Sequence, residues 1–143
     1  MSIMKEAAAD LPHYELETDV RTDDIDEQGH VNNTVYLRWV QDVATAHWRA
    51  ATTPEAQAQI YWVVLRHEID YKAAAVAGER ILLRTWVGMA SRLTFERHTE
   101  ILRASDGTLL AKARTLWCPV NSATGRPTRV PPEVREQFSA SGD

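Results

Sequence analysis

Cysteine is almost absent from this chain of 143 residues, in which Cys118 is the only one. A single cysteine excludes an intramolecular disulfide framework and is typical of a reducing compartment. Cys118 stands in an apolar, strand-like run, so we expect a buried and unreactive thiol. There is no run of about 18 apolar residues, and Met1–Asp10 has one lysine and no apolar core. The sequence therefore predicts a cytoplasmic protein with neither a transmembrane helix nor a signal peptide.

Excess positive charge is also lacking, since 16 Lys and Arg stand against 20 Asp and Glu, for a net charge of −4. This balance argues against a nucleic-acid-binding protein, which usually carries a basic patch or stripe. The five histidines show no metal-ligand spacing and lie far in sequence from Cys118, so no metal site is expected. No Gly-x-Ser-x-Gly run is present, which argues against a serine nucleophile on a strand-to-helix turn.

Hydrophobic periodicity indicates the secondary structure. Alternation predicts a strand over 14–22, and helical spacing predicts a long helix from Asn33 to Ala51, with Pro54 beyond its end. Further strands are predicted over 61–71, 81–88, 93–102 and 109–120, and a short helix reaches Phe138. Five basic residues are expected to keep other sheet positions polar: Arg84, Arg97, Arg103, Lys112 and Arg114. This order predicts a single α+β domain over 13–138, with a largely antiparallel sheet against one long helix. Residues 1–12 and 139–143 are predicted to be flexible tails.

The segment Asp24–Asn33 joins the first predicted strand to the long helix. It contains several ionisable residues, a glycine and two asparagines, either of which is a good helix N-cap. A carboxylate here supplies a base or a nucleophile, while the helix N-terminus supplies unpaired N–H groups and the positive end of its dipole. Such a junction is suited to chemistry on a polarised carbonyl.

From Tyr14 to Phe138 the chain resembles the hotdog-fold acyl-CoA thioesterases of the 4-hydroxybenzoyl-CoA thioesterase type. The residues that carry the resemblance are, in order, Arg21, Asp24, Asp26, Gly29, His30, Val31, Asn32, Asn33 and Tyr36. Softer matches lie at 67–71, 77–79 and 123–127. The resemblance implies a five-stranded antiparallel sheet wrapped around one long central helix. It also implies hydrolysis of an acyl-CoA to a carboxylic acid and coenzyme A, without a metal or redox cofactor, by a homodimer or homotetramer with active sites at subunit interfaces.

The same resemblance assigns the catalytic roles. Asp26 matches the catalytic carboxylate, which either attacks the thioester carbonyl or activates a water. Burial against the acyl chain is expected to make this carboxylate a better base. Asn33 matches the position whose backbone N–H polarises the thioester carbonyl. Asp24 is predicted to be structural, paired with the local backbone or with Arg21.

Five further residues are candidates for substrate binding. Gly29 allows a tight turn or a close approach of the acyl group, and His30 orients Asp26 or bonds to the substrate. Asn32 caps the helix. Tyr36 lies on the apolar stripe, where core packing competes with substrate contact. Arg92 is a candidate for the phosphates of coenzyme A, since arginine binds phosphate in a bidentate manner.

Arg126 and Arg129 are weaker candidates for the same phosphates. Two alternatives to an acyl-CoA thioesterase stay open. In the first, an acyl carrier protein takes the place of coenzyme A as the carrier of the acyl group. This alternative stays open because the plant-type thioesterases for such substrates carry a similar His-Val-Asn-Asn run. The second is a non-catalytic hotdog module that binds an acyl ligand or assembles a complex. The identity of the acyl group, whether aromatic, branched or straight, is also open.

Overall fold

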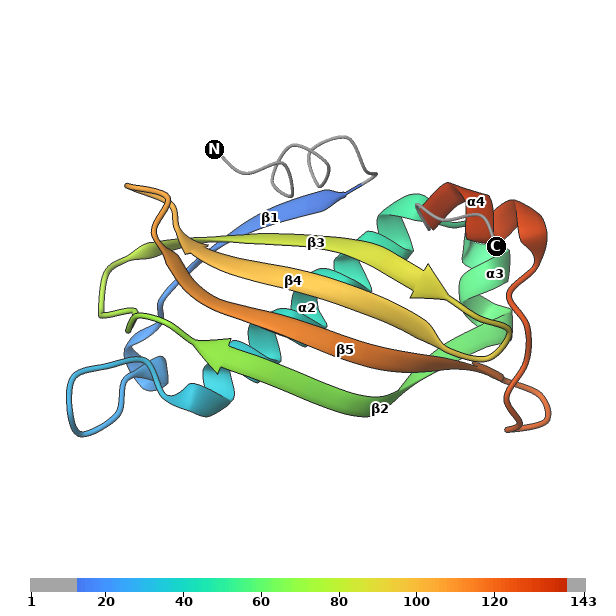
Figure 1. Cartoon of the computed structure of the whole chain (residues 1–143), viewed down its shortest axis with the longest axis horizontal. Helices are drawn as coiled ribbons and strands as arrows, with labels where there is room; N and C mark the ends of the chain where they lie inside the picture. The colour runs from blue at the N-terminus through green and yellow to red at the C-terminus, as the bar shows by residue number, and fades with distance from the viewer. Residues whose placement is uncertain (1–12, 139–143) are drawn as a thin grey trace.

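A computed structural model describes residues 13–138 of the chain, and the predicted tails, 1–12 and 139–143, lie outside them. The elements are β1 (Tyr14–Asp19), the 3-10 turn η1 (Thr22–Asp24), α2 (Asn33–Ala51), α3 (Pro54–Gln59), β2 (Ile60–Tyr71), β3 (Arg80–Ala90), β4 (Phe95–Arg103), β5 (Leu109–Asn121) and α4 (Pro132–Phe138). The five strands form one antiparallel sheet in the order β1-β3-β4-β5-β2, and α2 runs along one of its faces (Figure 1). The predicted α+β hotdog architecture is confirmed.

Helix α2 forms where it was predicted, from Asn33 to Ala51. The side chain of Asn32 accepts the N–H of Thr34 and so caps the first turn. Helical spacing then places one continuous apolar stripe against the sheet. The buried residues of α2 are Val35, Tyr36, Trp39, Val40, Val43, Ala44, His47 and Trp48. Its 19 residues make α2 about 28 Å long, so its two ends define two separate regions of the molecule.

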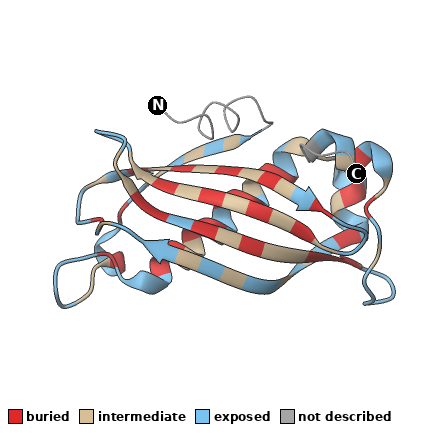
Figure 2. Ribbon diagram, viewed as in Figure 1, coloured by how far each residue is buried: buried red, intermediate tan, exposed pale blue. Residues whose placement is uncertain are grey.

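The sheet presents a buried face to α2 and a more polar face to solvent. Buried and half-buried residues alternate along β3 and β4, as Figure 2 shows. The core has two parts. One gathers around the first half of α2 and includes Trp39, Ile81 and Leu83. The other surrounds the C-terminal end of α2 and includes Trp48 and Phe95.

Some element boundaries differ from those that the sequence predicts. The first strand ends at Asp19 instead of residue 22, because η1 follows and the Asp24 carboxylate accepts the N–H of Arg21. Helix α3 was not predicted, although its start has a recognisable signal. Thr53 caps it by accepting the N–H of Ala56, and Pro54 occupies its first turn.

Strand β2 is one of the two edges of the sheet, since it pairs only with β5. Its register against β5 shifts between Val64 and Arg66, which marks a β-bulge at Leu65. Four large apolar or aromatic side chains of β2 are exposed: Tyr61, Val63, Leu65 and Tyr71. In the described part of the chain, no helix is long and apolar enough to cross a membrane.

Candidate active site

An ion pair with a buried carboxylate and a partly exposed arginine anchors the loop between β1 and α2. Asp24 is only 2% exposed, and its two carboxylate oxygens accept hydrogen bonds from Nη1 and Nη2 of Arg38 at 3.0 and 3.2 Å. The backbone N–H of Arg21 donates to the same carboxylate at 2.9 Å. The predicted structural role of Asp24 thus uses the backbone of Arg21 and, in addition, a side chain on α2. Burial raises the pKa of Asp24, but the bonds from Arg38 and Arg21 more than offset it, so the net pKa lies below 3.8.

Asp26 lies at the start of a tight turn that its own carboxylate closes. Oδ1 accepts the N–H groups of Gln28 and His30 at 2.9 and 3.2 Å, and the backbone N–H of Asp26 donates to the carbonyl of His30. Gly29 has a φ of 82°, a left-handed conformation that disfavours other residues, which accounts for the glycine in this turn. Among the described residues, none donates to Oδ2 of Asp26. One oxygen therefore holds the loop, and the other is available for chemistry.

The first amide of α2 is also available. The carbonyl and side chain of Asn32 accept the N–H groups of Val35 and Thr34, which satisfies two amides of the first turn. No described residue accepts the backbone N–H of Asn33. Asn32 itself donates its N–H to the carbonyl of Asp24 at 2.8 Å, so the helix start is tied to the anchored loop. A carboxylate oxygen and a helix N-terminal amide thus belong to one braced unit.

The other predicted residues of the motif divide into two groups. Gly29 and His30 are exposed on the loop, and His30 contributes its backbone, not its ring, to the contacts of Asp26. Tyr36 is buried: its hydroxyl accepts the N–H of Ala75 at 3.0 Å, and its ring meets Trp39 and Tyr71 edge-on. Tyr36 therefore packs in the core and supports the strand end beside the loop.

Arg92 lies far from Asp26 within one chain. The loop that carries Asp26 precedes the N-terminus of α2, whereas Arg92 follows β3 at the opposite end of the molecule (Figure 1). There Arg92 lines a groove of about 340 Å³ with Arg129 and Arg135. Nη2 of Arg135 donates to the carbonyl of Ala90, which fixes one wall of the groove. One chain alone does not bring the predicted phosphate ligand and the predicted carboxylate together.

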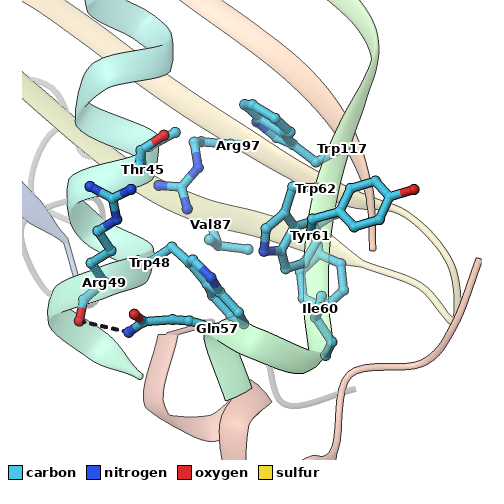
Figure 3. A pocket seen from close by; sticks show the side chains of 12 residues that line it. Thr45, Trp48, Arg49, Gln57, Ile60, Tyr61, Trp62, Val87, Arg97 and Trp117 are labelled. Atoms are coloured by element: carbon cyan, nitrogen blue, oxygen red, sulfur yellow. Dashed lines mark hydrogen bonds between the residues drawn. The ribbon is translucent and has the colours of Figure 1, made fainter. Parts of the chain in front are cut away.

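A second cavity, of about 350 Å³, opens between the C-terminal half of α2 and the start of β2 (Figure 3). We call it the tryptophan cavity. Its lining residues are Ala44, Thr45, Trp48, Arg49, Gln57, Ile60, Tyr61, Trp62, Val87, Phe95, Arg97 and Trp117. The sequence alone does not locate this cavity, because its aromatic residues come from α2, β2, β4 and β5.

Arg97 corrects one prediction. It was expected at a polar sheet position, yet it is only 4% exposed and faces α2. The alternation of β4 contained the signal, because Phe95, Arg97 and Thr99 share one face. Burial lowers the pKa of Arg97 to about 9, and burial together with the Arg97 charge lowers the pKa of His47 to about 4. At neutral pH the arginine is therefore charged and the histidine neutral.

No group of histidine, cysteine or acidic side chains within 13–138 has the arrangement of a metal site. Cys118 is buried, and its Sγ donates to the carbonyl of Pro119 at 3.6 Å. The thiol is thus placed as the sequence predicts.

Comparison with known proteins gives concordant results. A family model described as the thioesterase-like superfamily matches residues 20–138. The chain is 26% identical over 126 residues to the chloroplastic acyl-[acyl-carrier-protein] hydrolase FATB3 of Cuphea viscosissima, covering 87% of this chain and 30% of that protein. The chain thus spans about a third of the length of such curated relatives.

Two solved structures share the fold. One is a 1,4-dihydroxy-2-naphthoyl-CoA thioesterase from Synechocystis, with a TM-score of 0.75 and 20% identity, covering 87% of this chain and 93% of the other. The second is a thioesterase from Thermus thermophilus complexed with coenzyme A and Zn, with a TM-score of 0.76 and 23% identity, covering 89% of this chain and 97% of the other. At these identities the likeness concerns the fold.

Proposed function

Because the chain belongs to the thioesterase-like superfamily, we propose that it hydrolyses an acyl thioester to a carboxylic acid and a thiol. The observation that carries this proposal is that one loop–helix junction contains both a carboxylate oxygen of Asp26 and the backbone N–H of Asn33, and that no described residue bonds to either. In this reaction a C–O bond forms at the carbonyl carbon and the C–S bond breaks. The sulfur leaves as a thiolate and takes up a proton.

Each half of the junction has a defined role. The N–H of Asn33, at the positive end of α2, stabilises the negative charge that develops on the thioester oxygen. Oδ2 of Asp26 removes the proton from the attacking water, or attacks the carbonyl itself to form an anhydride that water then cleaves. Oδ1 remains bonded to the loop amides in either route, so the carboxylate keeps its orientation during the reaction.

Release of a thiol, detected with a thiol-reactive dye across a panel of acyl-CoAs, tests the activity directly. We expect Asp26→Asn to lower kcat by at least about 100-fold, the scale for loss of a positioned base. Asp23→Asn is the matched control, because Asp23 is an exposed carboxylate three residues away on the same loop. Equal activity of the two variants would remove Asp26 from the chemistry, and no turnover of any thioester by the wild type would refute the function.

The proposed carrier is coenzyme A. The groove of Arg92, Arg129 and Arg135 supports it, since clustered guanidinium groups suit phosphate oxygens. We expect the double variant Arg92→Gln, Arg129→Gln to have a higher KM for an acyl-CoA. Its KM for the matching acyl-pantetheine, which lacks the nucleotide, should be unchanged. A matched control is Arg80→Gln, at an exposed arginine of β3.

An acyl carrier protein is the second candidate carrier. The curated relative from Cuphea viscosissima, a hydrolase of acyl-carrier-protein substrates, favours it. The same arginines then dock an acidic protein surface instead of a nucleotide. Turnover of acyl-carrier-protein substrates that falls in the double arginine variant, with no turnover of acyl-CoA, would select this carrier.

We further propose a homodimer joined along β2. The edge position of β2 and its exposed Tyr61, Val63 and Leu65 support such pairing. Near one end of β2, the hydroxyl of Tyr71 donates to the carbonyl of Asn33, and near the other end Trp62 lines the tryptophan cavity. Antiparallel pairing of β2 with its copy brings these two ends side by side.

In this dimer, the Asp26 loop of one protomer lies beside the tryptophan cavity and the arginine groove of its partner. We expect Leu65→Lys, which puts a charge at a side chain that is 56% exposed on this edge, to shift the mass in sedimentation equilibrium toward the monomer. Leu93→Lys, at an exposed leucine in the β3–β4 turn, is the control. An unchanged dimer in the Leu65 variant would contradict the pairing.

A further inference from the structure

Two arginines, Arg49 and Arg97, line the tryptophan cavity, and no acidic side chain is among its described lining residues. The chain as a whole carries a net charge of −4, so the cavity reverses the sign of the protein locally. The guanidinium groups of both arginines lie on the side of the cavity next to α2 (Figure 3). A ligand group that enters this cavity therefore meets positive charge.

The guanidinium of Arg97 is held in place by the fold. Its Nη1 donates to Oγ1 of Thr85 at 3.1 Å and lies 3.0 Å from Nδ1 of His47. The ring of His47 in turn stacks on Tyr14, with 5.5 Å between the ring centroids. These contacts come from β1, β3 and α2, so the charge is preorganised before any ligand arrives. A preorganised and desolvated guanidinium favours a carboxylate partner, because charge-assisted bonds gain strength away from water.

Apart from Thr45 and Gln57, the rest of the cavity wall is apolar and aromatic. The ring of Trp62 meets Trp48 edge-on at 5.3 Å and Phe95 edge-on at 5.0 Å. Trp117 and Val87 complete the wall on the side of the sheet. Such surfaces favour the apolar body of a ligand, and its size is limited by a volume of about 350 Å³.

We propose that the tryptophan cavity binds an alkyl or aryl group ending in a carboxylate, with the carboxylate against Arg97. This assignment rests on the proposed function: the substrates are then monothioesters of dicarboxylic acids. Their thioester lies at the partner's Asp26 loop, and their second acid group lies in the cavity. A free carboxylic acid carries the same group and binds through the same contacts. The experiment below therefore distinguishes a free acid from the acid group of a thioester substrate.

Binding is measured first, by tryptophan fluorescence, with phenylacetate and its neutral analogue 2-phenylethanol as probes. Trp48, Trp62 and Trp117 line the cavity and report its occupancy without any turnover. We expect the wild type to bind phenylacetate at least about tenfold more tightly, which corresponds to one charge-assisted hydrogen bond. Arg97→Met should abolish this preference and Arg97→Lys should retain part of it. Arg80→Met is the control, and circular dichroism checks each variant's fold.

Equal affinity of the wild type for the acid and the alcohol would overturn the proposal, whether or not the variants fold. Turnover is then compared for adipoyl-CoA and hexanoyl-CoA, which differ by the terminal carboxylate. A higher kcat/KM for adipoyl-CoA that depends on Arg97 supports the substrate assignment. Binding of phenylacetate without that preference overturns the substrate assignment and leaves a site for a free acid. Binding of phenylacetate without turnover of any thioester refutes the proposed function. It leaves the proposal that the cavity binds a carboxylate intact.

Discussion

Replacement of Arg38 by methionine is expected to destabilise the fold at pH 7 by about 3 kcal/mol. The variant leaves the carboxylate of Asp24 buried, with the N–H of Arg21 as its remaining donor. Removal of one partner of a buried ion pair typically costs about 3–5 kcal/mol, because the other charge stays desolvated. The side chain of Arg38 is 37% exposed, so water reaches part of the vacated space and the low end of that range applies.

Urea denaturation, followed by tryptophan fluorescence, measures this change. Arg80→Met is a matched control, because it removes an arginine that bonds to Glu17 and Asp19 but lies on the surface. Exposed pairs contribute less than about 1 kcal/mol. A loss in Arg38→Met no larger than in Arg80→Met would show that the Asp24 pair does not brace the loop.

The stability difference between Arg38→Met and the wild type is also expected to depend on pH in a defined direction. In the wild type the pKa of Asp24 lies below 3.8, so the stabilisation that this group contributes is present above pH 3.8 and is lost as the pH falls through the folded value. Without Arg38, burial acts with less opposition and raises the folded pKa. The variant then takes up a proton as the pH falls from 7, so its deficit relative to the wild type should shrink between pH 7 and pH 4. A deficit that is constant over this range would refute the reasoning.

Two further predictions concern His47 and Asn32. Burial and the Arg97 charge hold the pKa of His47 at about 4, below its unfolded value of 6.5, so its contribution is complete above pH 6.5 and falls on acidification. The free energy of unfolding of the wild type, measured by urea denaturation, should fall by about 2 kcal/mol between pH 7.5 and pH 5. Most of this pH dependence should vanish in His47→Gln, and an unchanged pH dependence would contradict the assignment. Asn32→Ala removes the N-cap of α2 and should lower stability by about 1 kcal/mol. Asn33→Ala is the control, because the exposed side chain of Asn33 bonds to no described residue.

The long helix and the sheet were predictable because their patterns are local. Apolar residues of α2 recur at helical spacing, and those of β3 and β4 alternate, so periodicity alone places both elements. Asp26 and Asn33 were named as the candidate carboxylate and amide from the family resemblance, and their catalytic roles are proposals. Asp26 and Asn33 are seven residues apart within one loop and helix start, and their geometry depends on short-range turn and cap contacts.

The buried charges were not predictable, because their partners are distant in the sequence. Arg38 lies on the polar side of α2 by spacing, yet it reaches Asp24 fourteen residues earlier. Arg97 meets His47 across 50 residues, after α2 has folded onto β4. The alternation of β4 puts Arg97 on the same face as Phe95, but it does not show which distant side chain the arginine meets there.

In the proposed dimer, two defective copies of this chain can make one working site. The length of α2 separates Asp26 from the tryptophan cavity, so in the proposed dimer each site draws its carboxylate from one protomer and its cavity from the other. If one allele encodes Asp26→Asn and a second encodes Arg97→Met, each mixed dimer has one site with both lesions and one with neither. With random assembly about half of the dimers are mixed, so about a quarter of all sites are intact. Interallelic complementation of this kind does not arise where carboxylate and cavity belong to the same chain.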